Sequence, residues 1–283
     1  MAECDDAVTV RGRAGYGVLA AFGASGRSRF PGIPSPSRPP TSAGGCYAPA
    51  VTPLLRSLTI PVPDGKPRLR GVSHLLGAIC ACIATVGLLV RHVATPSKAL
   101  AVLIFGGSLT LLLGTSATYH CINWQPGPRG VLRRLDHAAI FVLIAGGWTP
   151  LLLLIPSTML ASADPPRLAG YAPLAAIWAF AVVGITKSML WPKAPRWITA
   201  GLCVTMGWMV IGEAIRRAPL VGTRNFAIIA VAGVTYSLGA VVYAVKWPNP
   251  APATFGYHEV FHALVLVASA LLFVHVLGVL AVV

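Results

Sequence analysis

Two histidines near the carboxyl end of the sequence, His258 and His262, stand four residues apart. Residues with this spacing lie on one face of a helix, about one turn from each other. Two imidazoles placed in this way can bind one metal ion, and His120 could add a third nitrogen from another helix. Three neutral imidazoles with an open fourth position are typical of catalytic zinc. The spacing therefore predicts a Zn²⁺ site at His120, His258 and His262.

Two further polar residues accompany His120. Ser116 lies four residues before it, on the same face of the predicted helix, and Asp136 follows after one short loop. Either side chain could hydrogen-bond a water molecule at the metal, and the Asp136 carboxylate could take its proton. Asp136 is therefore the candidate general base, and Ser116 is the candidate donor to the water or to a developing oxyanion.

The histidine pair also belongs to an H-E-x-x-H pattern, His258-Glu259-Val260-Phe261-His262. In zinc proteases the glutamate of this pattern is the general base. The pattern is short, and the one candidate ligand that follows it, His275, would lie about 20 Å further along a helix. A protease would also need ligands from earlier in the chain, so intramembrane proteolysis is the weaker alternative.

Composition indicates the surroundings of these residues. Of the 283 residues, 55% are hydrophobic and 11% are charged, whereas soluble domains carry about 25% charged residues. The mean hydropathy is +0.73, which excludes a freely soluble enzyme. The net charge of +14 comes from bases spread between apolar runs, which argues against nucleic-acid binding. The six cysteines form no CxxC pair, so we expect neither a disulfide framework nor a cysteine zinc site.

Seven apolar segments follow, each near the roughly 20 residues that span a bilayer. They cover about 72–92, 98–120, 134–155, 169–190, 196–213, 225–246 and 258–282. Helices satisfy all their backbone groups in lipid, and the alternating segments of a β-barrel are absent from the sequence. The sequence therefore predicts an all-α polytopic membrane protein, a bundle of seven transmembrane helices over 66–283. Residues 1–65, rich in Pro, Ser, Gly and Arg, predict a disordered tail.

The distribution of bases predicts the orientation of this bundle. With the N-terminus inside, ten Lys and Arg residues near the helix ends would face the cytoplasm and six would face outward. This bias favours an N-terminus inside the cell. Because successive spans alternate in direction, His120, Asp136, His258 and His262 then share the cytoplasmic side. His74, near the start of the first span, joins them there.

Several motifs resemble those of the hemolysin III proteins, bacterial members of the progestin and adipoQ receptor superfamily that are related to alkaline ceramidases. The motifs are Arg70-Gly-Val-Ser-His74, Ser116-Ala-Thr-Tyr-His120, Arg134-Leu-Asp136 with Gly147-Trp-Thr-Pro150, and Tyr257-His258-Glu-Val-Phe-His262. The resemblance covers about residues 66–283. It implies a seven-helix bundle with the N-terminus inside, zinc held by the three histidines, and Ser116 and Asp136 beside the water at the metal.

Two positions qualify the resemblance. In the receptor branch the position of Glu259 is commonly Gln, which implies that Glu259 is not the essential base. The first-helix motif also lacks the acidic residue that many relatives carry just before it, since Lys66 to Gly71 offers only bases.

The predicted function is hydrolysis of a lipid amide or ester that enters from the bilayer, in a multi-pass protein of the bacterial inner or plasma membrane. Ceramide-like lipids are suggested by the ceramidase kinship alone. One alternative is a non-enzymatic membrane receptor or sensor with structural zinc. Another is a cytolysin, as the family name records, although a secreted toxin must stay soluble before insertion and this chain is too apolar for that. A membrane lipid is the expected partner, and no pattern indicates an oligomeric state.

Overall fold

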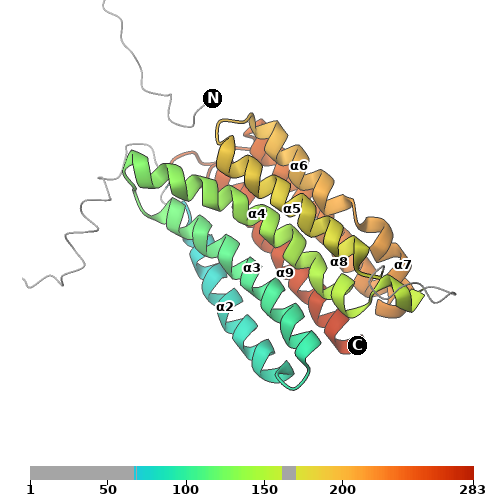
Figure 1. Cartoon of the computed structure of the whole chain (residues 1–283). Coiled ribbons are helices and arrows are strands. Elements are labelled where there is room, and N and C mark those ends of the chain that lie inside the picture. The colour runs from blue at the N-terminus through green and yellow to red at the C-terminus, as the bar shows by residue number, and fades with distance from the viewer. Residues whose placement is uncertain (1–66, 68, 161–169) are drawn as a thin grey trace, which may run out of the picture. The chain divides into compact units, whose positions relative to one another are not determined.

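The computed structural model describes residues 67, 69–160 and 170–283. The predicted tail, residues 1–65, and the bases Lys66, Arg68 and Arg167 lie outside the described residues. The helices are α2 (Val72–His92), α3 (Pro96–Cys121), α4 (Pro126–Leu154), the 3₁₀ helix η1 (Ser157–Leu160), α5 (Ala172–Leu190), α6 (Arg196–Trp208), α7 (Ile211–Val221), α8 (Thr223–Val245) and α9 (Tyr257–Val282). With α6 and α7 counted as one span, seven helical spans are long and apolar enough to cross a bilayer (Figure 1). The predicted seven-helix membrane bundle is confirmed.

Two spans have a bound that differs from the prediction by more than about three residues. Helix α4 begins at Pro126 rather than near residue 134, because proline suits the first helical turn and Arg129 adds polarity without ending a helix. The fifth span continues to Val221 rather than 213, and its residues Met209 and Val210 separate α6 from α7. Hydropathy marks the part of a helix that lies in hydrocarbon, whereas the helix itself can extend past the charges.

Buried Arg217 shows how the fifth span continues through charged residues. Its Nε donates to the carbonyl of Ile155 at 2.7 Å, and its other nitrogens bond Ser157 and Glu213. A guanidinium can be buried when all its donors are satisfied in this way. This network joins α7 to the segment that follows α4.

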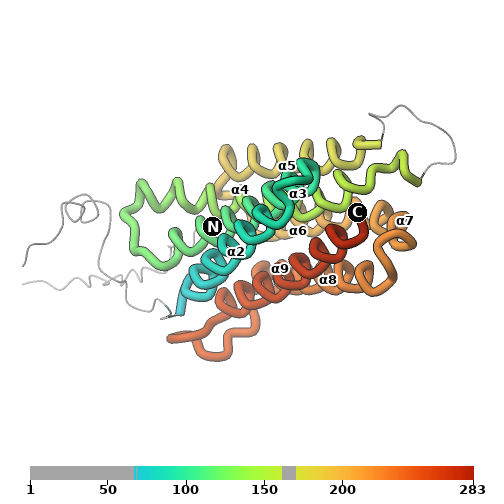
Figure 2. Tube along the Cα trace, turned by 90° about the horizontal axis from the view of Figure 1, so that it is seen from below, coloured from blue at the N-terminus to red at the C-terminus, as the bar shows by residue number. Residues whose placement is uncertain are grey.

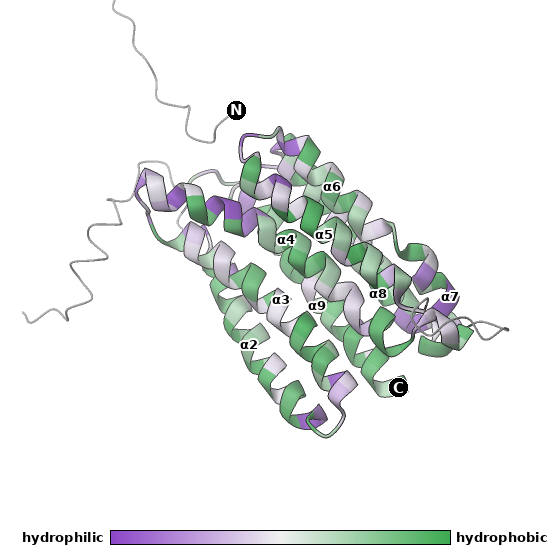
Figure 3. Cartoon of the chain, viewed as in Figure 1, coloured by the Kyte–Doolittle hydropathy of each residue, from purple (hydrophilic) through white to green (hydrophobic). Residues whose placement is uncertain are grey.

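The helices pack mainly with their sequence neighbours, α2 with α3, α3 with α4, α4 with α5, and α8 with α9. Helix α9 also contacts α2 and α4, so the last span closes against the first and third (Figures 1 and 2). The most apolar stretch of α4 is 72% buried, against 17% for α8, which places α4 at the centre. Apolar residues cover the middle of the helices, and hydrophilic residues gather near the start of α4 and along α7 (Figure 3).

Some glycines within the spans lie where two helices approach closely, since small residues at helix interfaces allow close packing. A Cβ added to Gly106 in α3 would lie 2.2 Å from Oγ1 of Thr85 in α2, whereas one added to the adjacent Gly107 would meet nothing within 4 Å. Thr85 cannot simply swing away, because its hydroxyl donates to the carbonyl of Ala81.

We therefore expect Gly106→Ala to destabilise the bundle by about 1–3 kcal/mol through overpacking. Gly107→Ala, the matched control, should change stability by less than about 1 kcal/mol. Thermal unfolding of both variants in the same detergent measures the difference. Equal melting temperatures for the two variants would contradict the α2–α3 packing described here.

Candidate metal centre

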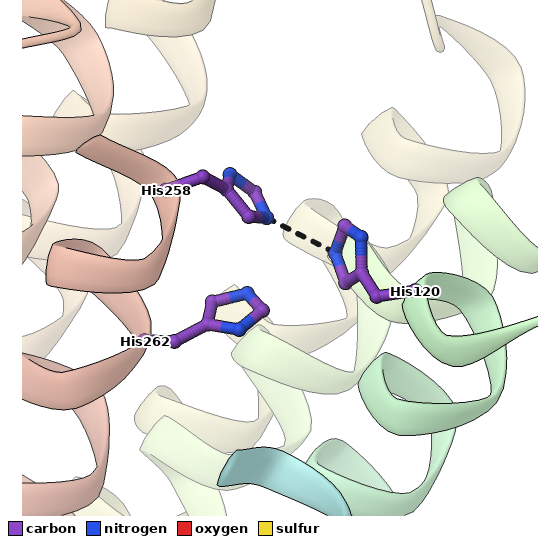
Figure 4. A group of neighbouring side chains, drawn as sticks. All are labelled: His120, His258 and His262. Carbon is purple, nitrogen blue, oxygen red and sulfur yellow. Dashed lines mark hydrogen bonds between the residues drawn. The ribbon is translucent and has the colours of Figure 1, made fainter. Parts of the chain in front are cut away.

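The three predicted imidazoles come together from two helices. His120 lies in the last turn of α3, and His258 and His262 lie in the first two turns of α9. One nitrogen from each ring lies within 4.8 Å of the others, and the three residues are 8%, 5% and 2% exposed. Nε2 of His258 lies 3.1 Å from Nε2 of His120, across the gap between the helices (Figure 4). The structure thus joins residues that are 138 positions apart in the chain.

The donor set suits zinc. Four-coordinate zinc takes imidazole nitrogens at about 2.0–2.1 Å, which places them roughly 3.3 Å from one another. The His120–His258 nitrogen pair is within a few tenths of an ångström of that spacing. All three nitrogens lie within 4.8 Å of one another, so the set must contract to bind one ion. The three histidines could therefore hold a zinc ion and leave a fourth position open.

Asp136 lies beside this cluster at the site end of α4. One carboxylate oxygen, Oδ2, is 3.9 Å from Nε2 of His120, and the side chain is 13% exposed. That distance is too long for a direct hydrogen bond between these two atoms, so this carboxylate oxygen adjoins the His120 ring without bonding its Nε2. A carboxylate in this position can accept a proton from a water molecule that lies between it and the cluster.

Ser116 has a partner that the sequence analysis did not assign. Its hydroxyl is 2.8 Å from Nδ1 of His74, the histidine in the first turn of α2. The His74 ring stacks on that of His262, with 3.8 Å between centroids and 13° between planes. The sequence placed His74 on the same side of the membrane, and the structure adds that it touches a candidate ligand and a candidate catalytic residue.

The glutamate of the H-E-x-x-H pattern is engaged elsewhere. Oε1 of Glu259 accepts from Nε of Arg70 at 2.9 Å, and Oε2 accepts from the backbone N–H of Gly256 at 2.8 Å. The residue is 4% exposed. Because both oxygens have partners and one forms the capping box of α9, Glu259 has a structural role rather than that of a protease base.

His275 lies apart from the cluster. Its Nδ1 is 3.3 Å from the backbone oxygen of Asn225, and the amide of Asn225 donates to the carbonyl of His275 at 3.2 Å. The pair joins α8 to α9 about 20 Å along the helix from His262. His275 is therefore an interhelical contact and adds nothing to the candidate centre.

An elongated cavity runs from the imidazoles into the interior of the bundle, with walls from every described span except α5. Asp136, His258 and His262 line one end. Leu272 lines the cavity 10 residues beyond His262, about 15 Å along the axis of α9. The centre is thus one end of a passage that extends through much of the apolar interior.

Polar side chains that line the middle of this cavity have hydrogen-bond partners within the protein. Nε1 of Trp208 donates to the hydroxyl of Ser237 at 2.9 Å, and the hydroxyls of Tyr236 and Ser269 lie 2.8 Å apart. These pairs leave the walls effectively apolar away from the imidazoles. The cavity therefore has one polar end and an apolar body, which is the polarity pattern of an amphiphile.

Comparison with known proteins places this geometry in context. A family model described as "Haemolysin-III related" matches residues 65–273. The chain is similar to Hemolysin-3 of Bacillus cereus, with 31% identity over 211 residues that cover 73% of this chain and 88% of that protein. It is also similar to the Hemolysin-3 homolog of Bacillus subtilis (strain 168), with 29% identity over 210 residues that cover 73% of this chain and 90% of the other. The matched region contains all three histidines and Asp136.

Proposed function

Because the chain belongs to the hemolysin III family and is a multi-pass membrane protein, we propose that it is a zinc-dependent hydrolase that cleaves an amide or ester bond of a membrane lipid. The observation that carries the proposal is the set of three buried imidazoles, two of which, His258 and His262, line the polar end of an apolar cavity. A hydrolase of lipids needs both parts, a centre that activates water and a passage that accepts an acyl chain.

In the proposed reaction His120, His258 and His262 hold the zinc ion. Zinc, when bound, supplies Lewis acidity that polarises a carbonyl group and makes water more acidic. Asp136 accepts the proton as the water oxygen adds to the carbonyl carbon. It then returns the proton to the leaving amine or alcohol as the carbon–nitrogen or carbon–oxygen bond breaks. Ser116, which lines the cavity, donates a hydrogen bond to the developing oxyanion.

The cavity supports a lipid as the substrate. Its lining residues Trp208 and Ser237 bond each other, and the lining residue Tyr236 bonds Ser269, so these side chains offer a bound molecule few polar contacts beyond the imidazole end. An acyl chain in this passage would bury apolar surface at about 25 cal/mol per Å². Ceramides are a reasonable first substrate to test, because the resemblance extends to the alkaline ceramidases.

The proposal includes a cytoplasmic N-terminus and a bacterial plasma membrane. Among the described residues, the helix ends near the centre carry more bases than the opposite ends, which supports the positive-inside orientation. The bases near the centre are Arg70, Arg129, Arg133, Arg134, Lys187, Lys193, Arg196 and Lys246. Those at the opposite ends are Arg91, Lys98, Arg216, Arg217 and Arg224.

Lipid turnover by the purified full-length protein tests the proposal. We expect release of fatty acid from ceramides or lysolipids, measured by mass spectrometry. A zinc chelator should abolish the release, and added zinc should restore it. Release that persists in a protein shown to be metal-free would contradict zinc dependence. A zinc-loaded protein that cleaves none of these lipids would contradict the hydrolase assignment.

A further inference from the structure

We infer that the segment Arg70–His74, at the start of α2, positions the three imidazoles although it supplies none of them. The inference rests on the metal centre of the proposed function. Three residues of this segment contact the two ligand-bearing helices, and each makes a different kind of contact. Together they form a bracket between α3 and α9.

The first contact is the ion pair between Arg70 and Glu259, which are 189 positions apart in the chain. Glu259 directly follows His258 and caps the first turn of α9 through the N–H of Gly256. The 2.9 Å ion pair of Arg70 therefore ties the turn that carries His258 to the start of α2. Glu259 is 4% exposed and Arg70 is 26% exposed, so loss of Arg70 would leave a buried carboxylate without this cation and should displace the turn.

The second contact is between Gly71 and the last turn of α3. Gly71 has φ +85°, and a Cβ at this position would lie 2.8 Å from Cβ of His120 and 2.9 Å from Sγ of Cys121. The backbone of the bracket thus packs directly against the base of the His120 side chain. Only glycine combines this left-handed backbone with this close approach.

The third contact is the stacking of His74 on His262, with the His74 ring fixed by the Ser116 hydroxyl. The bracket thereby touches His120 through Gly71, reaches the turn of His258 through Arg70, and covers His262 through His74. Residues that orient metal ligands without binding the metal typically weaken metal binding about 10- to 100-fold when they are mutated. The same range is expected here.

Zinc affinity of the full-length protein in detergent, measured by competition with a chromophoric chelator, tests the first contact. We expect Arg70→Ala to weaken zinc binding about 10- to 100-fold. Arg216→Ala is the matched control, because it removes an ion pair to Glu213 of similar length at the other end of the bundle. That control should change zinc affinity less than about threefold, and Arg70→Lys, which keeps the charge, should recover part of the lost affinity.

A glycine pair tests the second contact. Gly222 also has a positive φ, +84°, and nothing within 4 Å of an added Cβ, so Gly222→Ala strains the backbone without a clash. Its ψ of 147°, against −16° at Gly71, makes that strain the larger of the two, so the control is a stringent one. We expect Gly71→Ala alone to weaken zinc binding tenfold or more. If Gly71→Ala fails to fold, the zinc affinities of the Arg70 variants and of Glu259→Gln still test the inference. In the double variant Arg70→Ala with Glu259→Gln, the two losses should not multiply, because Arg70 acts through Glu259.

The results separate this inference from the proposed function. Wild-type protein that binds no stoichiometric zinc would overturn both. Wild-type zinc binding with unchanged affinity in the Arg70→Ala and Gly71→Ala variants would overturn the bracket alone. Melting temperatures of the metal-free proteins complete the test, since a bracket that only stabilises the fold would lower them without changing zinc affinity.

Discussion

Replacement of His262 by alanine is expected to abolish stoichiometric zinc binding. The side chain is 2% exposed, and its ring lies 4.4 Å from that of His258 and 5.0 Å from that of His120, centroid to centroid. Loss of one of three protein ligands should weaken zinc binding more than loss of a residue that only contacts a ligand, which weakens it about 10- to 100-fold. Zinc content of the purified variant, measured by inductively coupled plasma mass spectrometry, gives the result directly.

The same helix offers a matched control in His275. It is also a buried histidine of α9, at 1% exposure, but its partner is Asn225 and it lies about 20 Å from the cluster. His275→Ala should retain stoichiometric zinc even though it loses packing and a hydrogen bond. A His262→Ala variant that retains one zinc per chain would show that the zinc binds elsewhere.

Asp136→Asn is expected to retain zinc and to lose about 10²- to 10⁴-fold in turnover, the usual contribution of a general base. Asparagine has nearly the same shape as aspartate but cannot take the proton. The 3.9 Å separation between Asp136 and His120 means that the carboxylate adjoins the cluster rather than completing it, so zinc should stay. Initial rates of fatty-acid release, together with zinc content, provide both readouts.

Each combination of these two readouts has a definite meaning. Undiminished turnover by Asp136→Asn would remove the general-base assignment. Loss of both zinc and turnover would make Asp136 part of the metal centre. If wild-type protein carries zinc but cleaves no lipid, and zinc removal lowers only its melting temperature, the receptor or sensor alternative gains the support that the hydrolase loses.

The fold could be predicted from the sequence because the backbone N–H and C=O groups of every span must be hydrogen-bonded within the lipid. A stretch of about 20 apolar residues has few options in lipid other than a helix, so the seven spans could be counted without knowledge of their packing. The predicted ends of the spans were less accurate where a helix continues past charged residues. Arg217 shows the cause, because it is buried by partners, Ile155 and Ser157, that no hydropathy average can reveal.

The candidate centre was predictable only in part. The spacing of His258 and His262, together with the alternation of spans, indicated that His120 would lie at the same end of the bundle. The contacts around them depend on how helices rotate against one another, which one sequence does not specify. The Arg70–Glu259 pair joins residues 189 positions apart, and the first-helix motif indicated only that bases stand where relatives carry an acid.

The separation of the histidines along the chain also sets when the centre can form during biosynthesis. His120 is in the second span and His262 is in the last, so a ribosome must translate 142 further residues before the third imidazole exists. A nascent chain halted at any earlier codon would insert helices but could not retain the ion through this triad. Metal loading would therefore report that translation and membrane insertion had reached the seventh helix.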